Sequence, residues 1–190
     1  DKGLLTLNGF LGQRYARHKP LTLAASLTFE QSYDTIDGDS ASSAELYALL
    51  SSIAGVPIRQ GIAVTGSVNQ LGEVQAVGGV NEKIEGFYAA CKTRGLTGDQ
   101  GVLIPKANVE HLMLSRELVQ SVEEGRFHIY AVSSIDDGME VLTGIKMGKP
   151  RKDGTYSPTS LNGMVQQTLD GFADAYEGKT SGNSGNSRAS

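Results

Sequence analysis

The first residue that could carry chemistry is a serine at the junction between a loop and a helix. Ser40 stands in the run Gly38-Asp39-Ser40-Ala41-Ser42, just before a helical pattern. Backbone N–H groups and the positive end of a helix dipole lie near such a serine. Both stabilise an alkoxide and the oxyanion of an acyl-transfer step. Helix capping alone also explains the pattern, with Ser40 or Asp39 as the N-cap and Ser42-x-x-Glu45 as a capping box.

The second residue is a lysine on a predicted helix that follows Gly78-Gly79. The apolar face of this helix is formed by Val80, Ile84, Phe87 and Cys91. At roughly 100° per residue, Lys83 lies about 60° to one side of that face, at the expected margin of the core. Desolvation lowers the pKa of a lysine and makes it a general base near neutral pH. A snorkelling lysine with a buried stem is the structural alternative.

Thr65 is the third residue of interest. It shares a face of a predicted strand with Ser67 and precedes Gly66. Its hydroxyl suits a hydrogen bond to a lysine amine, although an ordinary strand threonine has the same pattern.

Other catalytic side chains are scarce. The three histidines, His18, His111 and His128, have no distinctive setting, and Ser42 breaks the last position of a G-x-S-x-G elbow. A histidine-dependent serine hydrolase is therefore an alternative with little local support. The single cysteine, Cys91, excludes an internal disulfide and a zinc site with two thiolates. We expect no metal and no cofactor in this chain.

Composition narrows the class of protein. The 190 residues suit one domain, and 17 basic against 21 acidic residues give a net charge of −4. This balance argues against a nucleic-acid partner, which favours a basic surplus. Because the chain has neither a run of about 18 apolar residues nor a signal-peptide core, we expect no membrane segment and a cytoplasmic location. It does not begin with Met, so we interpret it as a fragment of a longer protein.

Periodicity indicates the elements that must position these side chains. Strands are predicted at 4–7, 21–29, 61–68, 74–77, 102–104 and 127–132. Helices are predicted at 46–53, 80–91, 108–124 with a break near Ser115, 135–142 capped by Ser134, and 161–176. This mixture predicts an α/β (α+β) fold, a mixed sheet with packed helices, as a single domain over residues 1–176. The Gly/Ser/Asn-rich residues 177–190 are predicted to form a flexible tail.

Taken together, these pieces resemble the proteolytic domain of Lon proteases, specifically the B-type branch. The resemblance covers about Gly3 to Gly144. The motifs that carry it are Gly38-Asp39-Ser40-Ala41-Ser42, Val56-Pro57-Ile58-Arg59-Gln60, Ala63-Val64-Thr65-Gly66-Ser67, Leu71-Gly72-Glu73-Val74 and Val77-Gly78-Gly79-Val80-Asn81-Glu82-Lys83-Ile84-Glu85.

The resemblance implies a serine endopeptidase with a Ser–Lys dyad. Ser40 would be the nucleophile, and Lys83 would be the general base and later the acid. Thr65 matches a family threonine that holds the lysine amine, and Asp39 precedes the nucleophile as a residue of the helix start.

The resemblance also implies partners outside this chain. These are unfolded or damaged polypeptide substrates, further copies in a hexameric ring, and an AAA+ ATPase module in the parent chain that would hold ATP and Mg. The strand-rich segment that usually opens the family domain is missing. A non-catalytic Lon-like assembly module is the alternative function, although the presence of both Ser40 and Lys83 argues against it.

Overall fold

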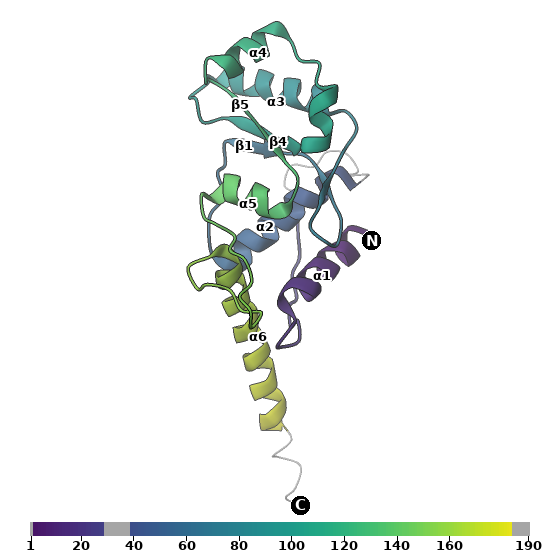
Figure 1. The fold of residues 1–190 in the computed structure, drawn as a ribbon, viewed down its shortest axis with the longest axis vertical. Coiled ribbons are helices and arrows are strands. Elements are labelled where there is room, and N and C mark those ends of the chain that lie inside the picture. Colours follow the sequence, from purple (N-terminus) through teal and green to yellow (C-terminus); the bar gives the residue numbers. More distant parts are fainter. Residues whose placement is uncertain (1, 29–38, 184–190) are drawn as a thin grey trace, which may run out of the picture.

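The computed structural model describes residues 2–28 and 39–183, with a small parallel sheet between layers of helices (Figure 1). In chain order the elements are α1 (Lys2–Tyr15), the 3-10 turn η1 (Asp39–Ala41), α2 (Ser42–Ala54), β1 (Ile62–Val64), β2 (Ser67–Val68), β3 (Val74–Gln75), α3 (Val80–Arg94), β4 (Gly101–Pro105), the 3-10 helix η2 (Lys106–His111), α4 (Arg116–Glu123), β5 (His128–Val132), α5 (Ile135–Thr143) and α6 (Leu161–Asn183).

The sheet has the order β1-β4-β5, and both neighbouring pairs are parallel. Strands β2 and β3 form a separate antiparallel hairpin. The predicted α/β class is confirmed, with both parallel and antiparallel pairings present. Parallel strands require a crossover, and α3 supplies the one between β1 and β4.

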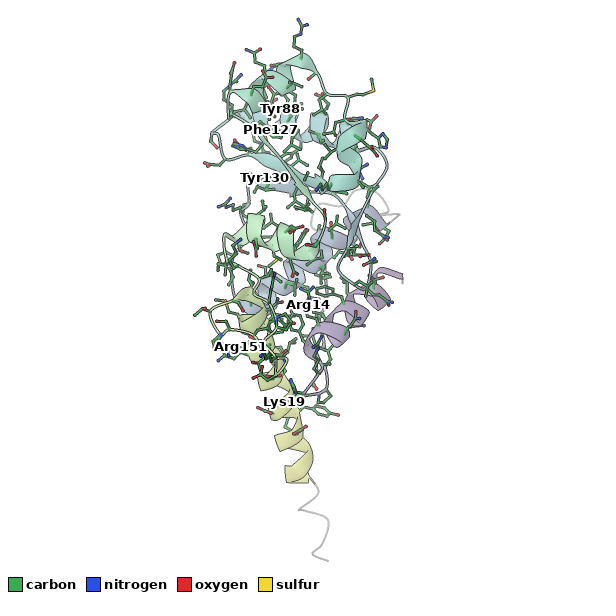
Figure 2. All side chains as sticks on the ribbon, in the orientation of Figure 1. Arg14, Lys19, Tyr88, Phe127, Tyr130 and Arg151 are labelled. Carbon is green, nitrogen blue, oxygen red and sulfur yellow. The ribbon has the colours of Figure 1, made fainter. Side chains whose placement is uncertain are left out.

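Strand β4 divides the core into two clusters because it is buried on both faces. Val102 and Ile104 pack against α3 and α4, together with Phe127. Leu103, between them, packs into a larger cluster with residues of α1, α2, α5 and α6. The smaller cluster includes an edge-to-face contact between Tyr88 and Phe127, whose ring centroids are 5.2 Å apart (Figure 2). The sheet is therefore a continuous apolar layer between two helical layers.

The N-terminal part of the chain differs from the prediction. Residues 4–7 were expected to form a strand, but they lie within α1. Leu7, Phe10 and Leu11 are buried at helical spacing, and a four-residue window is too short to show that period. The strand expected at 21–29 is also wrong for residues 21–28, which form no strand. Leu21 and Leu23 pack against the core without a partner strand, and Phe29 lies outside the described residues.

The helix and strand predictions for the rest of the chain are largely confirmed. The predicted helix at 108–124 divides into η2 and α4, and Ser115 accepts the N–H of Leu118 as the N-cap of α4. Ser134 caps α5 in a reciprocal capping box with Asp137. Helix α6 runs through Asn183, so the tail expected from residue 177 is helical up to that point. Residues 184–190 of that tail lie outside the described part of the chain.

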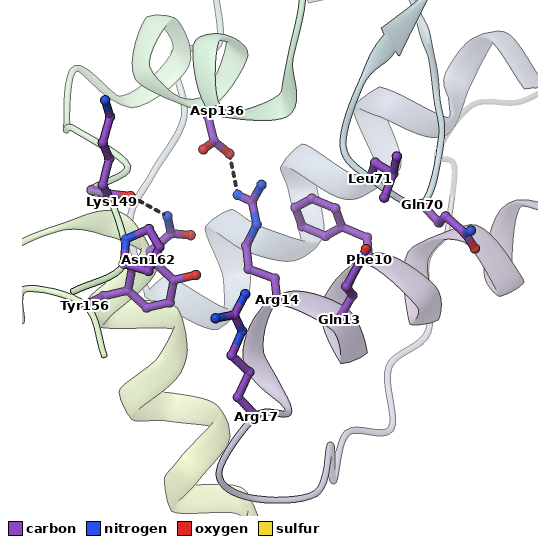
Figure 3. Close-up of a pocket in the computed structure, with 12 residues that line it drawn as sticks. Phe10, Gln13, Arg14, Arg17, Gln70, Leu71, Asp136, Lys149, Tyr156 and Asn162 are labelled. Carbon is purple, nitrogen blue, oxygen red and sulfur yellow. Dashed lines mark hydrogen bonds and ion pairs between the residues drawn. The ribbon is translucent and has the colours of Figure 1, made fainter. Parts of the chain in front are cut away.

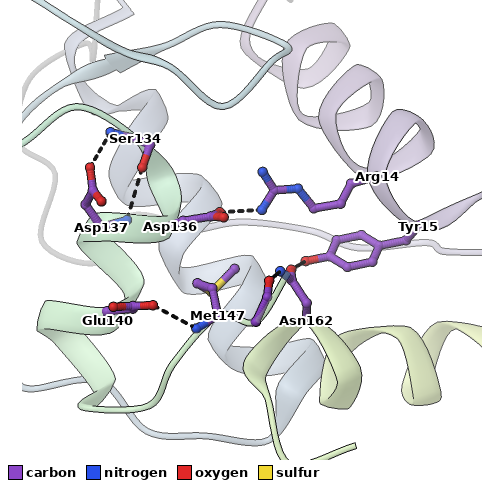
Figure 4. A network of polar contacts seen from close by, with 9 residues as sticks. Arg14, Tyr15, Ser134, Asp136, Asp137, Glu140, Met147 and Asn162 are labelled. Carbon is purple, nitrogen blue, oxygen red and sulfur yellow. Dashed lines mark hydrogen bonds and ion pairs between the residues drawn. The ribbon is translucent and has the colours of Figure 1, made fainter. Parts of the chain in front are cut away.

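Polar contacts tie α1, α5 and α6 together at the base of the domain (Figure 4). Arg14 of α1 forms an ion pair with Asp136 of α5. The hydroxyl of buried Tyr15 donates to Asn162 Oδ1 of α6 at 2.6 Å. These contacts satisfy polar groups within the larger cluster and fix the position of α1 against the rest of the fold.

Candidate active site

Ser40 lies in the middle of η1, directly before α2. The side chains on either side of it hold this turn in place. The Ser42 hydroxyl donates to the Asp39 carbonyl at 2.9 Å and accepts the Val68 N–H at 3.0 Å. The Asp39 carboxylate accepts a hydrogen bond from the Ser67 hydroxyl, with 2.5 Å between the oxygen atoms. Gly38, which precedes this turn, lies outside the described residues.

The capping explanation for this segment is wrong. The N-cap of α2 is Ala41, and no side chain caps the helix. Ser42 and Asp39 bond to the hairpin strand β2 instead of to the first turn of α2. The polar side chains of the motif therefore attach the serine turn to the segment that contains Thr65.

The predicted strand at 61–68 is interrupted at Thr65 and Gly66, and the break lies against the serine turn. The Gly66 N–H donates to the Ser40 carbonyl at 2.9 Å, and the Gly66 carbonyl accepts the Ser43 N–H at 3.2 Å. A Cβ on Gly66 would lie 3.0 Å from Ser43 Oγ and 3.1 Å from Val74 Cγ1. Only glycine permits so close an approach of the two backbones without displacing these neighbours.

Thr65 connects this break to the predicted lysine. Its N–H donates to the Leu103 carbonyl of β4 at 3.1 Å, which anchors the residue to the sheet. Its buried hydroxyl oxygen accepts a hydrogen bond from Lys83 Nζ at 3.2 Å. The structure thus brings Lys83 to Thr65, and it brings Ser40 to the adjacent Gly66. Among the described hydrogen bonds, none joins Ser40 directly to Lys83.

The environment of Lys83 differs from the one inferred from the helical wheel. Val80, Ile84 and Cys91 are buried as predicted, with Tyr88 rather than Phe87 completing the buried face. Lys83 itself is exposed. Its position in the first turn of α3 leaves the residue as a whole exposed, while its amine contacts the buried hydroxyl of Thr65.

Sequence reasoning missed two residues that position these elements. Ser67 bonds Asp39, and its place on the same face as Thr65 in the predicted strand was the available signal. Asn108 is buried after β4, and its side-chain amide accepts the Val77 N–H at 3.1 Å and donates to the Val77 carbonyl at 3.0 Å. These two bonds fix the approach to Gly79, whose φ of +65° starts α3. The sequence did not predict these bonds, because Asn108 was expected to lie within a helix.

The histidines have other contacts. His128 Nε2 lies 2.6 Å from the Gly98 carbonyl, and exposed His111 lies beside Glu110. His18 lies against Gly154. None of these contacts reaches Ser40, so the geometry gives no support to a histidine-dependent hydrolase.

Within residues 2–28 and 39–183, no group of three or more His, Cys, Asp or Glu side chains is arranged to hold a metal ion. No helix in the described part of the chain is long and apolar enough to span a membrane.

Comparison with known proteins identifies the family. The family model of the Lon protease (S16) C-terminal proteolytic domain matches residues 34–144. The chain belongs to this family. The matched range contains Asp39, Ser40, Thr65 and Lys83. The Lon resemblance inferred from the motifs is confirmed.

Relatives with names that mention Lon support this assignment. A Lon protease homolog from Escherichia coli (strain K12) is 54% identical over 144 residues, which cover 76% of this chain and 25% of the relative. One from Haemophilus influenzae is 44% identical over 174 residues, which cover 92% of this chain and 29% of the relative. An archaeal Lon protease from Thermococcus kodakarensis is 38% identical over 113 residues, which cover 60% of this chain and 16% of the relative. This Lon-type domain therefore spans less than a third of each of these relatives.

Proposed function

We propose that this Lon-type domain is a serine endopeptidase in which Ser40 is the nucleophile and Lys83 the general base. The observation that carries the proposal is that Ser40 and Lys83 each bond to one of two consecutive residues, Gly66 and Thr65. Lys83 Nζ bonds Thr65 Oγ1, and the Gly66 N–H bonds the Ser40 carbonyl. A nucleophile and its base must come within hydrogen-bond reach, and in unliganded sites this contact often tightens only when substrate binds.

The chemistry follows from the residue types. Lys83, as a neutral amine, takes the proton of Ser40 while Ser40 Oγ attacks the carbonyl carbon of the scissile bond. Backbone N–H groups around Ser40 would stabilise the resulting oxyanion. The C–N bond then breaks, and Lys83 gives the proton to the leaving amine. Water attacks the acyl-enzyme in the second half-reaction, with Lys83 again taking the proton and returning it to Ser40.

Two residues support the dyad in this proposal. Thr65 holds the amine of Lys83 in place through its buried hydroxyl, which fixes the direction of an otherwise mobile side chain. Asp39 acts on the backbone of the serine turn through Ser67 and takes no part in proton transfer. A bound substrate would cover the exposed Lys83 and exclude water from the dyad.

The activity of the whole protein is proposed from the family. We propose that the domain cleaves unfolded or damaged polypeptides as the proteolytic part of an ATP-dependent protease of the B-type branch in the cytoplasm. ATP and Mg would be bound by an AAA+ module of the parent chain, and this domain itself would use no cofactor. Several copies, six in the family ring, would enclose the sites and so restrict access to unfolded chains.

A fluorophosphonate probe tests the dyad, because it reacts covalently only with an activated serine. The proposal expects that mass spectrometry will find the adduct on the peptide that carries Ser40. It also expects that Lys83→Met will reduce the labelling rate by at least about 100-fold, the lower range for a general base. Labelling of another serine, or equal labelling of Lys83→Met, would contradict the proposed dyad.

A non-catalytic Lon-like assembly module is the second candidate function. The observation that favours it is the lack of a direct hydrogen bond between Ser40 and Lys83 in the described structure. That candidate predicts no probe labelling at any serine, with the oligomer intact by light scattering.

A further inference from the structure

A concave site lies beside the β2–β3 hairpin, at the junction of α1, α5 and the segment that precedes α6 (Figure 3). Its volume is about 310 Å³. Three cationic side chains line it, Arg14, Arg17 and Lys149, with Asp136 as the one acidic side chain. We call this site the basic pocket. Its lining carries a formal charge of 3 − 1 = +2, although the chain as a whole carries −4.

The cations of the basic pocket are not equivalent. Arg14 is half-buried and committed to the fold, because it pairs with Asp136 and lies 4.4 Å above the centre of the Phe10 ring. Arg17 and Lys149 are exposed, and no ion pair joins either one to an acidic side chain in the described part of the chain. Two positive charges are therefore available to an anionic ligand.

Folding creates this concentration of charge by joining two distant basic stretches. Residues 14–19 contain Arg14, Arg17, His18 and Lys19, and residues 146–152 contain Lys146, Lys149, Arg151 and Lys152. In Figure 2, Arg14, Lys19 and Arg151 lie in the same part of the molecule. Arg17 and His18 both approach Gly154, which follows the second stretch. Lys19 pairs with Asp174 and Lys146 pairs with Glu140, so the positive charge that can attract an anion here comes from Arg17 and Lys149.

The basic pocket adjoins a groove that extends to Asp39, the residue before Ser40. Gln70 and Leu71, at the tip of the β2–β3 hairpin, line the basic pocket and also a neighbouring groove of about 330 Å³. Asp39, the residue before Ser40, lines that same groove. Gln70 and Leu71 therefore separate the basic pocket from the groove beside Asp39, and a polypeptide that spans the hairpin tip would contact both.

We propose that the basic pocket binds acidic side chains of the polypeptide substrate and so gives the proposed peptidase a preference for acidic segments. This inference rests on the proposed function of the neighbouring site. The pocket combines cations with the apolar surfaces of Phe10, Pro150 and Leu71, and Leu71 is 55% exposed. That combination suits a peptide, which presents carboxylates and apolar groups together. A strip of phosphates would instead favour a continuous basic face.

Binding is tested with two fluorescent peptides in the Ser40→Ala background, where no cleavage is expected. One peptide carries three glutamates, and the other carries glutamines at the same positions. We expect the acidic peptide to bind about five- to tenfold more tightly at low salt, since two partly exposed charge contacts are each worth a few-fold in affinity. The double variant Arg17→Ala/Lys149→Ala should abolish this preference, and rising salt should weaken it.

Arg94→Ala/Arg116→Ala is the matched control, because it removes the same charge from two exposed residues that do not line the pocket. It should keep the preference. Equal binding of the two peptides, or a preference that survives Arg17→Ala/Lys149→Ala, would overturn the proposal. Binding of inorganic phosphate or a single-stranded oligonucleotide that is lost in the same variant, without any peptide preference, would also overturn it in favour of a phosphate site.

A kinetic measurement separates this proposal from the peptidase proposal. In the intact protein, the ratio of kcat/KM between acidic and amide peptides should be about five to ten, and close to one in Arg17→Ala/Lys149→Ala. If neither peptide is cleaved but the binding preference is present, the peptidase proposal fails while acidic recognition stands. If both are cleaved at equal rates, acidic recognition fails and the peptidase proposal stands.

Discussion

The Nζ atom of Lys83 donates a hydrogen bond of 3.2 Å to the buried hydroxyl of Thr65. This contact joins the first turn of α3 to the end of β1, and the next residue, Gly66, bonds the serine turn. Thr65 and Gly66 are therefore the structural link between the two halves of the proposed dyad.

Replacing the proposed nucleophile should remove activity without unfolding the protein. We expect Ser40→Ala to lower the rate of hydrolysis of an unfolded, fluorescently labelled polypeptide by at least about 1000-fold, as for nucleophiles that act as a unit with a base. Ser52→Ala, at an exposed position of α2, is the matched control and should keep full activity. Circular dichroism should show both variants folded. Substantial activity in Ser40→Ala would exclude this serine as the nucleophile.

Removing the Thr65 hydroxyl should impair catalysis through the position of Lys83. Thr65→Val keeps the shape of the side chain, and we expect kcat to fall about tenfold, which corresponds to one hydrogen bond. Thr65→Ser restores a hydroxyl and should recover most of kcat. Steady-state kinetics measures both variants, and KM should change less than kcat. If Thr65→Ser is as impaired as Thr65→Val, the residue acts by packing and not through its hydroxyl.

Because Gly66 lies close to Ser43, the effects of Gly66→Ala and Ser43→Ala on the free energy of unfolding should not be additive. A Cβ there lies within 3.0 Å of Ser43 Oγ, a buried oxygen without a hydrogen-bond partner in the described structure. We expect Gly66→Ala to lower the free energy of unfolding by about 1–3 kcal/mol through overpacking. In a Ser43→Ala background the loss should be smaller, because the oxygen is gone. Urea unfolding of the four proteins in this cycle measures the coupling, and strict additivity would contradict the contact.

Stability at acid pH should depend on Glu140. The Lys146 ammonium hydrogen-bonds its carboxylate and lowers its pKa, and the Met147 N–H adds to this effect. A lowered pKa in the folded state means that the stabilisation is present above the ordinary pKa of about 4.3 and is lost as the pH falls through the folded value.

The effect should be small, because the Lys146 side chain is 86% exposed and water screens its contact with Glu140. Urea unfolding between pH 6 and pH 3 should show a smaller loss of stability in Glu140→Gln than in the unchanged protein. Parallel pH curves for the two proteins would show that the Lys146 contact contributes nothing to folding.

The sequence predicted helices and strands correctly where capping residues or apolar runs within the element mark its ends. Helix α5 has a capping serine, an acidic residue three positions later and a terminal glycine, so its bounds followed from the sequence. Strand β4 was predicted from a short apolar run before Pro105. The strands predicted within residues 4–28 are wrong, because short apolar runs there are compatible with both the helical and the strand period.

The candidate site was predicted in part. The motifs made Ser40, Lys83 and Thr65 candidates, and the structure shows the contact that was expected between Lys83 and Thr65. The contacts of Asp39 with Ser67 and of Asn108 with Val77 were not expected, because each joins residues 28 or 31 positions apart. Exposure of Lys83 was also missed, since a helical wheel orders residues by angle and does not show what covers them.

The sequence by itself determined the residue types, the helix that follows Ser40 and the glycines that permit close approach. These are local properties, set by side-chain chemistry and by the backbone conformations that each residue allows. The tertiary structure alone decided which of these residues meet. Parallel pairing of β1 with β4 brings Thr65, which follows the last residue of β1, to Leu103, and it places Gly66 beside Ser40. Similarly, the charge of the basic pocket arises where stretches more than 120 positions apart pack together, and no local pattern encodes such a contact.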